Sequence, residues 1–169
     1  MRLPMLFLIL AVGSVFGRPD GSGSTGPEKT TASELKICWD LFEKGDYAAC
    51  TTRLAEVERR NKRPTEAERS ERLALMGSLA LVKGDPSKAT ALLNDGLVLF
   101  LQGKGTPVAG RRIYRSLGRI AYEEGDYHKA IGLYREQAVL EYARDEPKPG
   151  ALGGAEYNIG NCFWGMDQR

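Results

Sequence analysis

Three arginines in the second half of the chain have a spacing that suits carboxylate binding. Arg112, Arg115 and Arg119 follow one another at intervals of three and four residues, so a helix would place them on one face. A guanidinium group can donate two parallel hydrogen bonds to a carboxylate. This face is therefore a candidate binding surface for an acidic group. The other interpretation is that these arginines pair with neighbouring glutamates on a solvated helix face.

The sequence lacks the residue sets on which enzymes depend. His128 is its single histidine, and no cysteine, histidine or aspartate spacing indicates a metal site. Glu123 and Glu124 are adjacent in sequence, whereas acid–base pairs face each other across a cleft. Residues 103–106 lack the upstream glycine and the preceding strand of a phosphate loop. We predict no catalytic residue, no metal, no cofactor and no enzymatic activity.

Composition and charge are those of an ordinary globular domain or a short repeat array. The 169 residues are 42% hydrophobic and 27% charged, and the formal net charge is +2. Glutamates and arginines are interleaved rather than grouped in blocks, as on solvated helix faces. Because the chain has no basic stripe, we expect no nucleic-acid partner.

Residues 1–17 predict a secretory signal peptide. Arg2 supplies a positive charge, residues 3–16 are almost continuously apolar, and Val15 and Gly17 suit the cleavage site. An uncleaved membrane anchor is the alternative. As a helix the apolar run spans about 21 Å, which is short of the roughly 30 Å hydrocarbon core of a bilayer. We expect a secreted, periplasmic or otherwise extracytoplasmic protein without a membrane span after cleavage.

Residues 18–30 predict a flexible linker, since they are rich in glycine and serine and have no apolar face. Beyond the linker the spacing of apolar residues becomes helical. Ser33 is the expected N-cap of the first helix.

The stretch 114–138 predicts two helices joined by a tight turn at Gly125 and Asp126. Apolar residues recur at spacings of three and four before and after this turn; they are Tyr114, Leu117, Ala121 and Tyr122, then Ala130, Leu133, Tyr134 and Ala138. Gly118 and Ala130 are small and stand where the two helices would cross. We therefore expect their backbones to approach closely there.

The same pattern occurs before and after this stretch. Gly45 and Gly84 are each followed by aspartate, and the three turn glycines are separated by 39 and 41 residues. A further helix is expected to begin near Leu152, after a loop over residues 144–149. The chain beyond residue 30 is therefore predicted to be all-α.

The pattern at Tyr114, Leu117, Gly118, Ala121, Ala130 and Tyr134 resembles the tetratricopeptide repeat (TPR), here with long units of about 40 residues. The resemblance covers residues 31–169, about three repeats and the first helix of a fourth. It implies a right-handed superhelical array of antiparallel helix pairs, an α-solenoid, in which the first helix of each repeat lines a concave groove.

Carrying the family's groove positions over to this chain implies a set of partner-binding residues: Arg112, Arg115, Arg119, Tyr122, Tyr157, Asn158, Asn161 and Trp164, with Trp39 and Phe42 from the first repeat. The lysines of the family's carboxylate clamp are absent. The second repeat instead has Ala74, Ser78 and Leu81 at these positions. A chaperone C-terminus is therefore not the expected ligand.

The resemblance implies a non-enzymatic scaffold or adaptor that binds a peptide or protein segment in its groove. The alternative is that the chain is the N-terminal targeting and repeat portion of a larger exported enzyme or assembly factor, with a catalytic part beyond Arg169. Phe163 and Trp164 on the last helix are expected to be exposed and to make the isolated protein self-associate.

In the repeat register, Cys38 takes the position of Gly118 and Cys50 that of Ala130, where the two helices of a pair come closest. A Cys38–Cys50 disulfide with Cys162 free is therefore one expectation, and export would maintain it. The other is that both cysteines are small buried hydrophobic residues.

Overall fold

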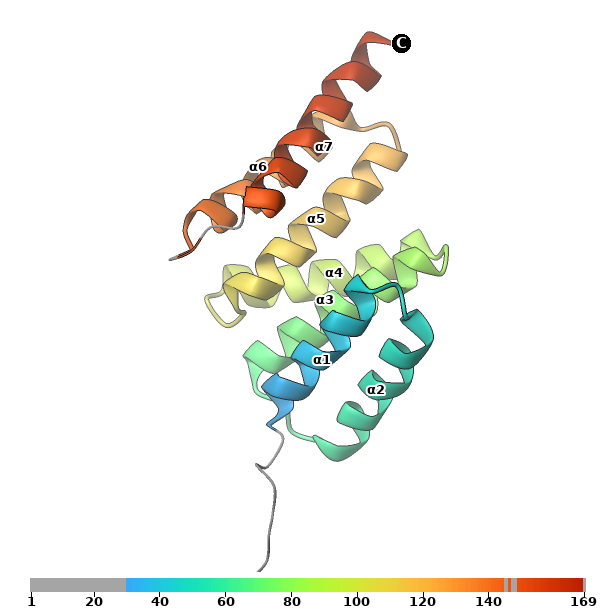
Figure 1. The fold of residues 1–169 in the computed structure, drawn as a ribbon, viewed down its shortest axis with the longest axis vertical. Helices are drawn as coiled ribbons and strands as arrows, with labels where there is room; N and C mark the ends of the chain where they lie inside the picture. Colours follow the sequence, from blue (N-terminus) through green and yellow to red (C-terminus); the bar gives the residue numbers. More distant parts are fainter. Residues whose placement is uncertain (1–29, 145, 147–148, 169) are drawn as a thin grey trace, which may run out of the picture.

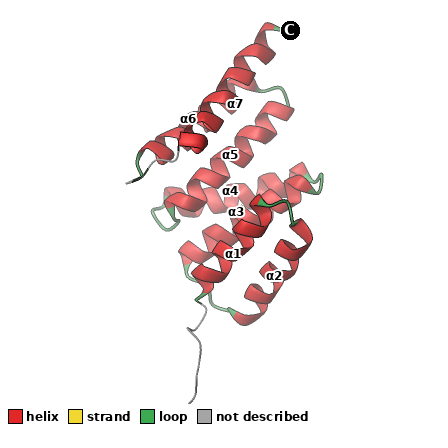
Figure 2. Ribbon diagram, in the orientation of Figure 1, coloured by secondary structure: helices red, strands yellow, loops and turns green. Residues whose placement is uncertain are grey.

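The computed structural model describes residues 30–144, 146 and 149–168, and within them it is helical without a strand (Figures 1 and 2). The predicted signal peptide and all of the predicted linker except Thr30 lie outside the described residues. The all-α prediction is confirmed for the part described. The helices are α1 (Thr31–Glu43), α2 (Tyr47–Arg60), α3 (Glu66–Val82), α4 (Pro86–Leu101), α5 (Pro107–Glu123), α6 (Tyr127–Tyr142) and α7 (Pro149–Asp167).

Each predicted glycine–aspartate turn joins two helices that pack against each other. The turn glycines have the positive φ angles that side chains disfavour, at 80° for Gly45, 79° for Gly84 and 78° for Gly125. The aspartate that follows each glycine accepts a hydrogen bond from a backbone N–H in the first turn of the next helix; these N-caps are Asp46, Asp85 and Asp126. Two residues thus end one helix and begin its antiparallel partner.

Two helix starts differ from those expected from the sequence. Thr30, not Ser33, caps α1, because its hydroxyl oxygen accepts the Ser33 N–H at 3.2 Å. Helix α7 begins at Pro149 rather than near Leu152. Proline suits a first helical position, where its missing N–H has no partner to lose, so the proline starts the helix instead of ending the loop.

Glycines mark the close approach of paired helices, as predicted. The ring of Tyr134 in α6 fills the space beside Gly118 in α5, where an added Cβ would lie 2.7 Å from a ring carbon. Gly77 in α3 has the same relationship to Leu93 in α4, at 2.6 Å. Larger residues at these two glycines would push the helices apart.

The helix pairs follow one another along the long axis of the molecule, with α1 and α2 at one end and α6 and α7 at the other (Figure 1). Contacts between α1 and α3, and between α3 and α5, connect the first helices of successive pairs. One core cluster runs through α1 to α5 and includes the fully buried Trp39, Leu75, Leu93 and Ile113. A second cluster joins α5, α6 and α7 around Tyr134 and Cys162. Burying each such large apolar side chain contributes about 1.5–3 kcal/mol.

Candidate functional site

A hollow of about 290 Å³ lies where the first helices of the successive pairs come together. Its wall draws on α1, α3, α5, α6 and α7, so residues far apart in the sequence meet there. The lining residues are Phe42, Ser78, Leu81, Val82, Arg115, Ser116, Arg119, Tyr134 and Asn158. Arg115, Arg119 and Asn158 belong to the set predicted to bind a partner, and Phe42 was expected beside them.

The two arginines of the hollow carry charge that a ligand can reach. Arg119 is exposed, and its Nε lies 2.7 Å from Oε1 of Glu123 one turn further along α5. An exposed pair of this kind is worth only about 0.3–0.5 kcal/mol, so an incoming carboxylate can replace Glu123. Arg115 is also exposed and makes no ion pair within the described part of the chain. Both cations are therefore open to an anionic group.

Two buried serines line the hollow and connect α3 with α5. The Oγ atoms of Ser78 and Ser116 are 3.1 Å apart, and the Ser78 hydroxyl donates to the carbonyl oxygen of Ala74 at 2.8 Å. Since the Ser78 hydroxyl donates its proton to Ala74, the hydroxyl of Ser116 must donate to Ser78. The pair connects α3 with α5, the helix that carries both Arg115 and Arg119.

Tyr134 contributes a neutral phenol to the same wall. Burial raises the pKa of Tyr134 to about 12, so the hydroxyl keeps its proton at neutral pH. Of the remaining lining residues, Phe42, Leu81 and Val82 are apolar and Asn158 adds a side-chain amide. The hollow thus combines two positive charges, small hydroxyls and an apolar wall.

Arg112, the third arginine of the predicted face, does not line this hollow. Its guanidinium lies 3.9 Å from the ring centroid of Trp39, and it forms ion pairs with Glu43 at 3.3 Å and Glu71 at 3.7 Å. Trp39 Nε1 donates to the same Glu71 carboxylate at 3.1 Å, and the Thr106 hydroxyl donates to its other oxygen. Arg112 therefore connects α1, α3 and α5 within the chain.

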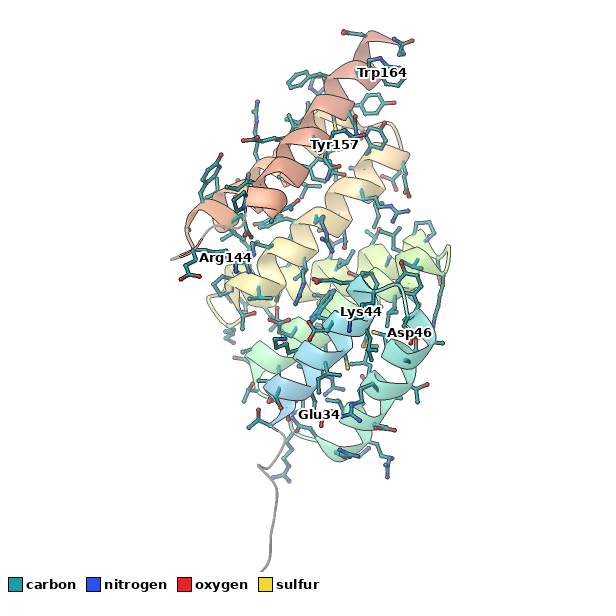
Figure 3. All side chains as sticks on the ribbon, in the orientation of Figure 1. Glu34, Lys44, Asp46, Arg144, Tyr157 and Trp164 are labelled. Atoms are coloured by element: carbon teal, nitrogen blue, oxygen red, sulfur yellow. The ribbon has the colours of Figure 1, made fainter. Side chains whose placement is uncertain are left out.

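The other predicted groove residues also lie outside the lining of the hollow. Tyr122 packs against Tyr127 with ring centroids 5.4 Å apart, next to the second core cluster. Asn161 is half-buried in α7. Tyr157 and Trp164 are 69% and 64% exposed and project from α7 (Figure 3). Of the eight residues predicted, the hollow brings together Arg115, Arg119 and Asn158.

The prediction missed Val82, Ser116 and Tyr134 as lining residues. Tyr134 was expected only as a packing residue of the second helix of its pair. Ser78 and Ser116 stand at different positions relative to the glycines of their helices, one after Gly77 and two before Gly118. The repeat register therefore gives no signal that these serines meet. Only the crossing of α3 and α5 brings them together.

The three cysteines are fully buried and carry free thiols. Cys38 and Cys50 belong to the same core cluster, whereas Cys162 lies in the second. Burial raises the pKa of the Cys38 thiol to about 11, and the neighbouring Cys50 adds to this effect. A disulfide between these two residues stays a prediction.

Comparison with known families finds no family model that matches the chain, and no curated protein matches it either. Within residues 30–144, 146 and 149–168, no helix is both long enough and apolar enough to cross a membrane. The same residues hold no cluster of three or more histidine, cysteine, aspartate or glutamate side chains that suits a metal ion.

Proposed function

We propose that this protein is a non-enzymatic interaction scaffold, a TPR-like right-handed array of antiparallel helix pairs that binds a peptide or protein segment in its hollow. The same pattern of helix glycines, turn glycines and capping aspartates recurs along the chain, and this recurrence supports the array. Gly77, Gly118 and Gly160 are each the twelfth residue of their helix, in α3, α5 and α7. The turn glycines Gly84 and Gly125 each follow seven residues after Gly77 and Gly118, and a capping aspartate comes directly after each of them.

One observation carries the proposal. Four helices that are first in their pairs, α1, α3, α5 and α7, contribute side chains to a single hollow with two exposed guanidinium groups. A stack of helix pairs serves as a binding scaffold when its first helices share a concave face. The sharing of one hollow is what such a scaffold requires.

The chemistry of the wall favours a particular class of ligand. Guanidinium groups bind a carboxylate, an asparagine amide can bond a peptide backbone, and the apolar wall accepts a hydrophobic side chain. The volume of about 290 Å³ is just below the roughly 300–1,000 Å³ of small-molecule sites. The hollow therefore suits a carboxylate and one neighbouring apolar side chain of a peptide better than a large cofactor.

Peptide binding can be measured directly with a fluorescent peptide library that varies one acidic and one adjacent apolar residue. We expect binding of peptides with both features and loss of binding when the acid is replaced by its amide. The Arg115→Gln/Arg119→Gln double variant should weaken binding about 10- to 100-fold, because hydrogen bonds to charged groups contribute roughly 1.5–3 kcal/mol.

Arg135→Gln is the matched control, since Arg135 is exposed on α6 and does not line the hollow. The control should bind the peptide as the unaltered protein does. Equal binding by the double variant and the control would contradict the proposed site.

We also propose that the protein acts outside the cytoplasm, on the basis of the signal-peptide pattern in residues 1–17. N-terminal sequencing of protein recovered from the secreted or periplasmic fraction should begin at Arg18. Recovery of an intact Met1 in a membrane fraction would favour the uncleaved anchor instead.

A further inference from the structure

One face of α7 is uncovered in the described part of the chain and carries alternating large and small residues. Gly153, Tyr157, Gly160 and Trp164 are spaced by four, three and four residues, so they form a straight seam along the helix. All four are exposed, and Figure 3 shows Tyr157 and Trp164 projecting from α7. The opposite face of α7, with the buried Ala155 and Cys162, belongs to the fold.

The seam has open notches at its glycines. An added Cβ at Gly153 or Gly160 would meet nothing within 4 Å. By contrast, the equivalent twelfth-position glycines, Gly77 in α3 and Gly118 in α5, are each covered by a large side chain of a neighbouring helix. The glycine position that packs against a neighbouring helix in α3 and α5 is therefore uncovered in α7.

The chain also packs aromatic rings against helix glycines in its interior. An added Cβ would lie 2.7 Å from Phe100 at Gly110, 2.7 Å from Tyr134 at Gly118 and 2.7 Å from Tyr127 at Gly165. A ring lying on a glycine is thus a recurrent helix contact in this fold. The exposed seam offers two rings and two glycines for the same kind of contact.

When the seam is reversed, each aromatic residue falls opposite a glycine of the forward order. We propose that two copies of this chain associate through α7, antiparallel, about a two-fold axis between residues 158 and 159. In that register Tyr157 lies opposite Gly160 of the second copy, and Trp164 lies opposite its Gly153. By symmetry the two remaining pairs are the same contacts, so four rings fill four notches.

Other arrangements of two α7 helices match less well. A parallel pair in register places Tyr157 against Tyr157, which overcrowds the interface at that point. It also places each glycine against the same glycine, which leaves a void there. The alternation of small and large residues therefore selects the antiparallel pair. A second copy is the occupant that this face itself specifies, since each copy supplies both the rings and the notches.

The expected dimer is reversible. A buried tyrosine or tryptophan removes about 150–250 Å² of surface from water, and the seam buries four such rings with Phe163 at its flank. The four rings together bury at most about 600–1,000 Å², which is below the lower limit of about 1,200 Å² for stable specific association. We therefore expect dissociation on dilution rather than a permanent dimer.

Sedimentation equilibrium of the full chain tests the association. The unaltered protein should pass from monomer to dimer with rising concentration, and Gly160→Leu should raise the dissociation constant at least tenfold, because the new side chain fills the notch. Gly132→Leu is the matched control, since Gly132 is exposed in α6 and also has open space around it. Circular dichroism checks that both variants stay helical. A monomer at all concentrations, or equal dissociation constants for Gly160→Leu and the control, would overturn the proposal.

Cross-linking tests the register independently. Chains carrying Gly153→Cys are mixed with chains carrying Trp164→Cys under mild oxidation, with the unaltered protein as the blank because its cysteines are buried. The mixture should form a disulfide-linked dimer while neither variant alone does, since two copies of one position are about 16 Å apart along the antiparallel axis. Linkage of Gly153→Cys to itself, or an unlinked mixture, would rule out this pairing.

Discussion

The guanidinium of Arg112 in α5 lies 3.9 Å from the ring centroid of Trp39 in α1, although 73 positions separate the two residues in the sequence. Glu71 of α3 completes the contact, because it accepts a hydrogen bond from the indole and pairs with the guanidinium. The contact joins the first helices of three successive pairs. The three predicted arginines therefore differ in role. Arg112 joins helices within the chain, whereas Arg115 and Arg119 line the hollow.

Replacing Arg112 should destabilise the fold, unlike replacing its neighbour. Its side chain is only 21% exposed, and Arg112→Ala leaves the Glu71 carboxylate without its cation. We expect a loss of about 2–3 kcal/mol in the free energy of unfolding, below the roughly 3–5 kcal/mol of a fully buried pair. Arg115→Ala should change it by less than about 0.5 kcal/mol. Urea denaturation of the two variants measures the difference, and similar midpoints would contradict this division of roles.

The local folding of the chain could be predicted from the sequence because it depends on short-range rules. The glycine–aspartate turns end and begin helices through the φ angle of one residue and the side chain of the next. The spacing of apolar residues then orients each helix. Membership of the hollow depends instead on how α3 crosses α5, and no local rule gives that crossing. Arg112 shows the limit, since the sequence predicted its helix, but its contacts with Trp39 and Glu71 come from two other helices.

The Ser78–Ser116 pair should show strong coupling in a double-mutant cycle. Ser78→Ala leaves the Ser116 hydroxyl buried without its partner, so we expect a loss of about 1–3 kcal/mol. The double variant Ser78→Ala/Ser116→Ala removes both polar groups and should cost less than the sum of the single changes. Thermal unfolding of the four proteins measures the coupling. Strictly additive losses would mean that the two hydroxyls do not bond each other.

Alanine should lower the stability of the protein at Gly84 and raise it at Gly132. Gly84 has a φ of 79°, so Gly84→Ala forces a side chain into the left-handed region at a cost of about 1–2 kcal/mol. Gly132 lies within α6 with open space around it, and Gly132→Ala should stabilise the protein by about 0.5–1 kcal/mol. Calorimetric melting temperatures should therefore fall for the first variant and rise for the second. A fall for both would show that Gly132 has a neighbour that alanine disturbs.

The reduced protein should lose stability in alkali. Burial raises the pKa of the Cys38 thiol from 9.0 to about 11, so the unfolded chain releases this proton at lower pH than the folded chain. Between pH 9 and 11 the unfolded state binds fewer protons, and the free energy of unfolding falls as pH rises, by at most about 1.4 kcal/mol per pH unit from this group. Cys38→Ala should flatten that slope when urea unfolding is followed across the range. An unchanged slope would assign the alkaline loss to other groups.

The state of Cys38 and Cys50 decides whether that titration occurs in the exported protein. Protein recovered from an oxidising compartment is expected to hold the Cys38–Cys50 bond, which closes a short loop and contributes about 3 kcal/mol by the loop-entropy estimate. Thiol reagents should find no reactive cysteine in the native protein, because all three are buried. After denaturation without reductant they should find one, Cys162. Three thiols after denaturation would exclude the bond, and the alkaline loss would then appear in the exported protein as well.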